Sequence, residues 1–143
     1  MSGRESCRVG NFRVMVENSA KLHILIVDDE ALIRWSVGEI LAHAGYDVSE
    51  AGSAKETLQR LSAGPVPDII LLDHRLPDSA DLKLLETIRR LAPRSPVVMM
   101  TAYGTPAMQA GALALGVHRV VSKPVEMRDL LPLVQEAYAS RPQ

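Results

Sequence analysis

Short apolar runs alternate along the chain with longer segments in which apolar residues recur every three or four positions. Five runs predict β-strands, at residues 22–27, 47–51, 68–72, 96–100 and 119–122. The run at 69–72 is unbroken, as in a strand buried on both faces. The run at 47–51 is weaker and predicts a strand near an edge of the sheet.

The segments between and after these runs predict five helices. Their buried faces are predicted to carry Ile33, Val37, Ile40, Leu41 and Ala44, then Leu58 and Leu61, then Leu84, Leu85, Ile88 and Leu91, and last Met127, Leu130, Leu131, Val134 and Tyr138. Trp35 lies off the first of these stripes. Pro132 predicts either a last helix that begins near Asp129 or a kink in that helix.

Capping residues mark two of the helix boundaries. Ser53 and Glu56 have the spacing of a capping box, so each side chain is expected to bond to the other residue's backbone N–H. Thr105 followed by Pro106 opens the fourth helix, and Gly116 closes it. These signals fix where the second and fourth helices begin.

Strands and helices that alternate through short links predict an α/β fold, a doubly wound five-stranded parallel sheet with five helices on its two faces. Residues 21–139 are expected to form one domain, followed by a short tail at 140–143. Residues 1–20 show no periodicity, and their polar composition predicts a disordered or loosely attached extension. Met15 is a second candidate start, which leaves the status of residues 1–14 open.

Polar residues directly follow four of the apolar runs. Asp28 and Asp29 follow the first, Asp73 the third, Thr101 the fourth and Lys123 the fifth. If these are adjacent parallel core strands, the side chains converge in a crevice at the carboxyl ends, where open α/β sheets bind ligands. Each residue alone also fits a helix cap, a turn or a solvated charge. Their recurrence at four strand ends favours a functional site.

The three carboxylates predicted to meet there need a counter-charge. Like charges held close together raise one another's pKa, so Asp28, Asp29 and Asp73 are expected to bind a cation. Ligands that are all oxygen atoms favour Mg²⁺ or Mn²⁺ over zinc. The four histidines share no ligand spacing and predict surface or strand-edge positions. The sequence contains no phosphate-binding glycine loop and no serine nucleophile motif.

Composition narrows the function classes. The 143 residues carry 16 basic and 17 acidic side chains, a net charge of −1, which argues against a dedicated nucleic-acid binder with a basic face. Cys7 is the only cysteine, so the chain cannot form an internal disulfide, which fits a reducing cytoplasm. No run approaches the roughly 18 apolar residues of a membrane span. The N-terminus lacks the apolar segment of a secretory signal.

Taken together, these motifs resemble the receiver domain of two-component response regulators. The resemblance runs from about residue 22 to 138 and rests on Asp28-Asp29, Asp73 with Arg75-Leu76-Pro77, Thr101-Ala102-Tyr103-Gly104, and Lys123-Pro124. Residues 33–35 and 101–104 further resemble receivers of the NtrC-like class, which often precede a sigma-54-dependent ATPase. For residues 21–139 the resemblance implies a receiver fold, which is flavodoxin-like, and a cytoplasmic signalling role.

The resemblance also implies roles for the site residues. Asp73 would take a phosphoryl group from a phosphohistidine of a sensor histidine kinase or phosphotransfer protein, and Thr101 and Lys123 would bind the phosphoryl oxygens. Mg²⁺ or Mn²⁺ would be held by Asp28, Asp29, Asp73 and the backbone carbonyl of Arg75. The domain would catalyse only its own phosphorylation and dephosphorylation, so it is not expected to be an enzyme acting on other substrates.

Phosphorylation would in turn switch an output or a partner contact. The partner implied, besides the kinase, is a second copy bound through the fourth helix, fifth strand and fifth helix, with no nucleic acid and no membrane contacted by this domain. Four residues depart from the family pattern. Val120 and Val125 stand where aromatic residues are usual, and Ala80-Asp81 replaces the usual Asp-Gly. The usual aromatic relay to the output face is therefore missing at Val120.

Three other classes remain open. A flavodoxin-like cofactor binder needs a phosphate-binding loop after the first strand, where this chain has three successive acids, 28–30. A haloacid-dehalogenase-type phosphatase needs a second acid two residues after its nucleophile, where this chain has Arg75. A phosphorylation-independent docking or dimerisation module with a receiver-like fold would not need the complete set of acids, Thr101 and Lys123. The output, the cognate kinase and the oligomeric state are not encoded in any motif of the sequence.

Overall fold

A computed structural model of the chain describes residues 21–79 and 82–141. In chain order its elements are β1 His23–Val27, α1 Ala31–His43, β2 Asp47–Ala51, α2 Ala54–Ala63, β3 Ile69–Asp73, α3 Lys83–Leu91, β4 Val97–Thr101, α4 Pro106–Ala114, β5 Arg119–Ser122 and α5 Met127–Ala139. Within the described residues the predicted alternation of five strands and five helices is confirmed. The predicted extension at 1–20, the departure at 80–81 and the last two residues of the predicted tail lie outside them.

The described strands form one parallel sheet in the order β2-β1-β3-β4-β5. The chain adds β2 on one side of β1 and then crosses over to add β3 on the other side of β1. This change of direction makes the carboxyl ends of β1 and β3 a topological switch point. The edge position predicted for β2 is confirmed. The prediction that β5 is a core strand is wrong, because β5 forms the opposite edge and its four residues are exposed or half-buried.

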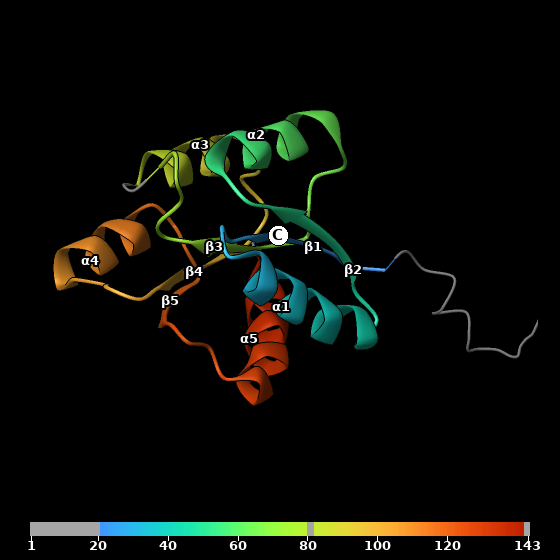
Figure 1. The fold of residues 1–143 in the computed structure, drawn as a ribbon. Coiled ribbons are helices and arrows are strands. Elements are labelled where there is room, and N and C mark those ends of the chain that lie inside the picture. Colours follow the sequence, from blue (N-terminus) through green and yellow to red (C-terminus); the bar gives the residue numbers. More distant parts are fainter. Residues whose placement is uncertain (1–20, 80–81, 142–143) are drawn as a thin grey trace, which may run out of the picture.

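Helices cover both faces of the sheet (Figure 1). Helices α1 and α5 lie on one face and α2 and α3 on the other, with α4 beside β4 and β5. Alternate residues of β1 enter the two cores: Ile24 and Ile26 pack towards α1 and α5, while Leu25 and Val27 pack towards α2 and α3. Successive strand residues point to opposite faces, so a strand covered on both faces must be apolar throughout.

Four residues predicted on buried helix faces are exposed instead. Ile33, Leu91 and Met127 expose 38%, 46% and 46% of their surface, and Ala44 is also exposed. Each lies in the first or last turn of its helix or just beyond it. Trp35 exposes 57% of its surface, which agrees with its position off the stripe.

The N-terminus of α2 is only partly capped as predicted. The Oγ of Ser53 accepts from the Glu56 N–H at 3.1 Å. The Glu56 carboxylate, however, accepts from the Gly52 N–H at 2.5 Å, so the reciprocal half of the predicted capping box is wrong. The N–H groups of Ala54 and Lys55, the first two residues of α2, donate to the Asp78 carboxylate at 2.7 and 3.1 Å. These bonds lower the pKa of Asp78 and attach the loop after β3 to α2.

Helix α4 begins as predicted. Thr105 Oγ1 accepts from the Met108 N–H at 3.1 Å, and Pro106 is the first residue of the helix. Gly116 follows the helix with a φ of 94°, a left-handed conformation that glycine adopts without a Cβ clash. Both ends of α4 therefore match their sequence signals.

Helix α5 runs unbroken from Met127 to Ala139 with Pro132 inside it. The start near Asp129, one of the two outcomes predicted from Pro132, is therefore not the one observed. Because proline has no N–H, the carbonyl of Arg128 lacks its usual helical partner. A kink at Pro132 stays a prediction.

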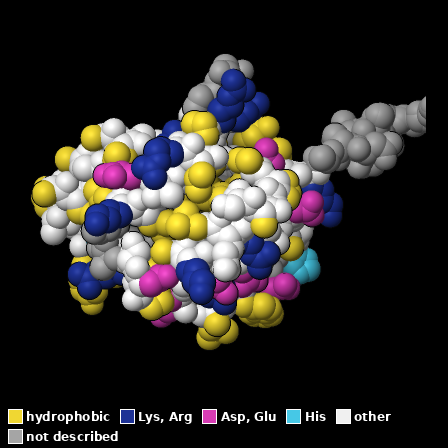
Figure 2. Space-filling view, turned by 90° about the horizontal axis from the view of Figure 1, so that it is seen from above, with side chains coloured by type: hydrophobic (Ala, Val, Ile, Leu, Met, Phe, Trp, Pro, Cys, Tyr) yellow, Lys and Arg dark blue, Asp and Glu magenta, His cyan; other side chains and the backbone are white. Residues whose placement is uncertain are grey.

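The face covered by α2 and α3 has a mixed surface (Figure 2). Basic, acidic and apolar side chains are interspersed over it. Across the part of the chain that the structure describes, no helix has both the length and the apolar character needed to cross a lipid bilayer.

Candidate functional site

Three polar side chains at strand ends close the following turn in the same way. In each case the side-chain oxygen accepts the N–H two residues further on: Asp28 from Glu30 at 2.9 Å, Asp73 from Arg75 at 3.3 Å, and Thr101 from Tyr103 at 3.2 Å. Aspartate and threonine commonly form such bonds where a regular element ends. The bonds orient all three side chains at the carboxyl edge of the sheet.

Lys123 connects two of the acids. Its Nζ lies 3.1 Å from Asp28 Oδ2, 3.2 Å from Asp73 Oδ2 and 3.7 Å from the Glu30 carboxylate. The pairing of β4 with β5 continues to Lys123, whose N–H donates to the Thr101 carbonyl at 2.8 Å. Asp28 and Asp73 are 1% and 6% exposed, so the ammonium group is their counter-charge in a largely buried setting.

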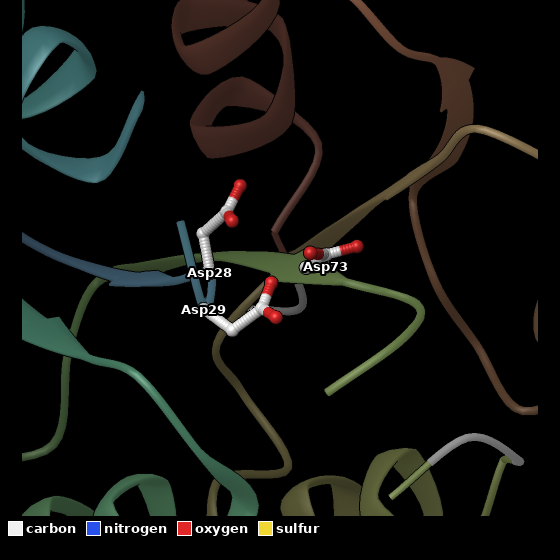
Figure 3. Close-up of side chains that lie close together, drawn as sticks. All are labelled: Asp28, Asp29 and Asp73. Carbon is white, nitrogen blue, oxygen red and sulfur yellow. The ribbon is translucent and has the colours of Figure 1, made fainter. Parts of the chain in front are cut away.

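Asp29 completes an acidic group with Asp28 and Asp73 (Figure 3). One carboxylate oxygen from each residue lies within 4.8 Å of the other two. Asp28 and Asp73 are buried and Asp29 is exposed, so the group is accessible from the side of Asp29. The donors are all carboxylate oxygens, and this donor set fits Mg²⁺ or Mn²⁺.

The electrostatics leave Asp73 short of positive charge. Burial raises the pKa of Asp73, the charge of Asp28 raises it further, and Lys123 only partly offsets both. Burial alone would lower the pKa of Lys123, but its bond and charge interactions with Asp28, and then with Asp73, outweigh burial and raise that pKa above 10.5. Lys123 therefore stays charged, and a further cation beside Asp73 would be favourable.

Arg34 holds the backbone beside the acidic group. Its guanidinium donates to the Asp28 carbonyl at 2.5 Å and, through Nε, to Glu50 Oε1 at 2.8 Å. Arg34 lies on α1 and Glu50 on β2, so the loop that carries Asp28 is fixed between a helix and a strand. The sequence pattern carries no sign of this contact, since Arg34 and Glu50 are 16 residues apart.

His74 belongs to the site although its sequence position predicted only a surface or strand-edge histidine. Its N–H donates to the Met100 carbonyl at 2.8 Å, so the pairing of β3 with β4 runs one residue past Asp73. The ring Nδ1 lies 3.4 Å from Thr101 Oγ1. Burial, and then the charge of Arg75, lower the pKa of His74. Its place directly after Asp73 was the one signal in the sequence.

Gly104 allows the loop after β4 to approach Thr101 closely. A Cβ at this position would lie 2.8 Å from Thr101 Cγ2, closer than two such atoms pack. The glycine of the Thr-Ala-Tyr-Gly motif therefore lets the loop fold back against the threonine it follows.

The structure brings most of the predicted site residues together. The three acids form one group, and Lys123 contacts two of them. Thr101 ends β4, the strand paired with the one that carries Asp73. The side chain of Arg75 is exposed, and metal binding by its carbonyl stays a prediction. Val120 is half-buried and packs against the core under α2 and α3.

A family model for the response regulator receiver domain matches residues 24–135. The chain belongs to this family. The receiver is 38% identical over 117 residues to the response regulator protein PilR of Pseudomonas aeruginosa, and 32% identical over 114 residues to the DNA-binding transcriptional regulator NtrC of Escherichia coli. These matches cover 82% and 80% of this chain but 26% and 24% of those proteins, so the chain spans about a quarter of their length.

Solved structures of receivers share the fold. A CheY-like receiver domain protein from Methanospirillum hungatei superimposes with a TM-score of 0.80 at 33% identity, covering 84% of this chain and 95% of that one. The receiver domain of NtrX from Brucella abortus gives a TM-score of 0.74 at 30% identity, covering 82% and 98%. The flavodoxin-like receiver fold and the likeness to NtrC-like regulators, both predicted from the sequence, are confirmed.

Proposed function

We propose that this receiver accepts a phosphoryl group on Asp73 from a phosphohistidine of a sensor histidine kinase or phosphotransfer protein. The observation that carries the proposal is the position of Asp73, a buried carboxylate at the end of a central strand, ion-paired with Lys123 and next to two further acids. In the transfer, an Asp73 oxygen forms a bond to phosphorus, the phosphorus–nitrogen bond to the donor imidazole breaks, and the imidazole takes up a proton.

The acidic group supports a metal requirement for this transfer. Asp28, Asp29 and Asp73 would hold Mg²⁺ or Mn²⁺ together with the carbonyl of Arg75. When bound, the ion would neutralise charge on the carboxylates and on the incoming phosphoryl oxygens. Besides binding the ion, Asp28 would stay aligned, because its Oδ1 accepts a hydrogen bond from the Glu30 N–H.

Lys123 and Thr101 are the residues available to bind the transferred group. Phosphoryl transfer depends mainly on alignment and charge neutralisation. Lys123 would exchange its contact with Asp73 for one with a phosphoryl oxygen, while its bond to Asp28 keeps the ammonium group in place. The Thr101 hydroxyl would donate to another phosphoryl oxygen. The phosphoryl group adds a charge of about −2, which would draw both side chains inward and repack the loops behind them.

The output of this switch is part of the same proposal. A repacked β4–α4 loop would change the face formed by α4, β5 and α5, through which a second copy or a partner would bind. Apart from its own phosphorylation and dephosphorylation, the receiver would catalyse no reaction. We assign it to the cytoplasm, because its single cysteine fits a reducing compartment.

Titration with beryllofluoride, a phosphoryl mimic, in the presence of Mg²⁺ tests the proposal. Trp35 is the only tryptophan in the chain and is partly exposed on α1, the helix that directly follows the acids at 28–30, so its fluorescence is the available optical reporter. The expected result is a saturable change that needs Mg²⁺ and is lost in Asp73→Asn. Asp47→Asn, which alters an exposed acid at the start of β2, should leave the response unchanged. A response that persists in Asp73→Asn would contradict the assignment.

A further inference from the structure

The inference concerns His74, whose side chain lies beside the hydroxyl of Thr101. The two residues are held side by side by the sheet: Asp73 pairs with Met100, and the bond from the His74 N–H to the Met100 carbonyl carries that register one residue further. Continued by one position, the register places His74 opposite Thr101. Their side chains therefore share one face of the sheet, and Nδ1 lies 3.4 Å from Oγ1.

The other hydrogen bond of the Thr101 hydroxyl indicates which residue donates in this contact. A hydroxyl has one proton to donate and two lone pairs that accept. The Oγ1 already accepts from the Tyr103 N–H at 3.2 Å, and its own proton remains to be donated. Among the described residues, the other polar group recorded within hydrogen-bond reach of Oγ1 is Nδ1 of His74, which can accept that proton in the tautomer protonated at Nε2. Thr101 is 3% exposed, so leaving that proton unpaired would be costly.

We propose that His74 is a positioning residue that holds the Thr101 hydroxyl in its unphosphorylated orientation and thereby opposes activation. The inference rests on the proposed function, since the proton donated to His74 is the one that a phosphoryl oxygen would require. Binding of the phosphoryl group must first break the Thr101–His74 contact. His74 thus sets how readily the receiver switches, without touching the transferred group.

The size of the effect follows from one exchanged hydrogen bond. A net intramolecular hydrogen bond shifts an equilibrium by about two- to tenfold. The contact is long, at 3.4 Å, so the lower part of that range is expected. Removing the acceptor should therefore tighten binding of a phosphoryl mimic rather than weaken it, which a purely structural role would not do.

The test compares His74→Leu with His74→Asn in beryllofluoride titrations with Mg²⁺. Leucine fills the half-buried position without an acceptor, while asparagine offers its carbonyl oxygen close to the place of Nδ1. His74→Leu should bind the mimic about two- to fivefold more tightly. His74→Asn should restore the affinity of the unmodified protein, and Mg²⁺ affinity measured alone should not follow the same pattern. In a Thr101→Ala background, His74→Leu should have no effect on affinity.

The outcomes separate this inference from the function on which it rests. Absence of any beryllofluoride binding by the unmodified protein would overturn both. Binding by the unmodified protein, with His74→Leu unchanged or weaker, would overturn the role of His74 alone. The same tightening in the Thr101→Ala background would also overturn it, because the effect would not pass through the hydroxyl. If His74→Leu does not fold, the Nδ1 nitrogen resonance decides, because Thr101→Val must shift it in the unphosphorylated protein if the contact exists.

Discussion

The Nζ atom of Lys123 lies 3.2 Å from Oδ2 of Asp73, so the proposed phosphoacceptor is ion-paired before any donor arrives. This ion pair neutralises the charge of Asp73 only in part. Lys123 divides its contacts between Asp73 and Asp28, and the pKa of Asp73 stays raised because burial and the Asp28 charge together exceed what Lys123 offsets. The charge of Asp73 at the carboxyl edge of the sheet is thus incompletely neutralised, which is consistent with a site arranged for a cation and a phosphoryl group.

Asp73→Asn should stabilise the metal-free receiver at neutral pH. A folded-state pKa above the unfolded value of 3.8 means that ionising Asp73 costs more in the fold than in the unfolded chain. The stability that the protonated Asp73 carboxyl contributes to the fold is therefore complete below pH 3.8 and is lost as pH rises through the raised pKa. Asparagine does not ionise, so the variant should not show this loss. Its free energy of unfolding at pH 7 should be higher by roughly 1 kcal/mol, or about 4 °C in Tm.

Thermal unfolding in EDTA at several pH values measures this gain. The difference between Asp73→Asn and the unmodified receiver should grow as pH rises from below 3.8 and then level off. A gain of equal size at low and neutral pH, or a loss at neutral pH, would show that ionisation of Asp73 is not the cause.

Asp29→Ala should weaken Mg²⁺ binding on the order of tenfold or more, because it removes one of three oxygen ligands. Asp29 is exposed, so the substitution should leave the fold intact. Asp47→Asn is the matched control, since Asp47 is also an exposed acid but lies at the start of β2, outside the acidic group. Calorimetric titration measures both. Equal affinities for Asp29→Ala and the unmodified receiver would remove Asp29 from the metal site.

Arg75 and Tyr103 should prolong the phosphorylated state. Each lies two residues beyond a site residue, and both side chains are exposed at the same edge of the sheet, Tyr103 by 75%. Large side chains there would hinder the water that hydrolyses the acyl phosphate. The double variant Arg75→Ala/Tyr103→Ala should lose its phosphoryl group faster, followed as decay after removal of the donor. Arg94→Ala, an exposed arginine just before β4, is the control. Slower or unchanged decay in the double variant would exclude shielding.

The loop from Thr101 to Thr105 should move on activation while Val120 stays in place. Val120 is β-branched, has few rotamers and packs against the core, so it cannot move between buried and exposed positions as a tyrosine would. Gly104 has no Cβ to block movement of the loop against Thr101. Structures with and without beryllofluoride test this. A rearrangement centred on Val120, or an unmoved loop, would refute it.

The sequence predicted the fold and the acidic site because both depend on strong local signals. Apolar runs defined the strands, and four of the five were followed directly by a polar residue of the candidate site, as with Asp73 after 69–72. Side-chain contacts between distant segments carried no such signal. The bonds from Arg34 to Glu50, from α2 to Asp78, and between His74 and Thr101 depend on where the elements meet in space.

The exposed residues that were predicted to be buried have a related explanation. Helical periodicity assigned Ile33 and Leu91 to buried faces, although both are exposed. A repeat of 3.6 residues identifies the apolar face of a helix but does not indicate whether the ends of that face are covered. The edge position of β5 was missed for a similar reason, since strand order is set by the packing of the crossover helices and not by the apolar content of Val120 and Val121 alone.

Mass spectrometry of the receiver after incubation with acetyl phosphate and Mg²⁺ tests the central claim most directly. The account predicts one added phosphoryl group, mapped to the peptide that contains Asp73 and released by hydroxylamine, as expected for an acyl phosphate. Modification should not occur in EDTA or in Asp73→Asn. A phosphoryl group that maps to another residue, or one that still forms in Asp73→Asn, would contradict the account.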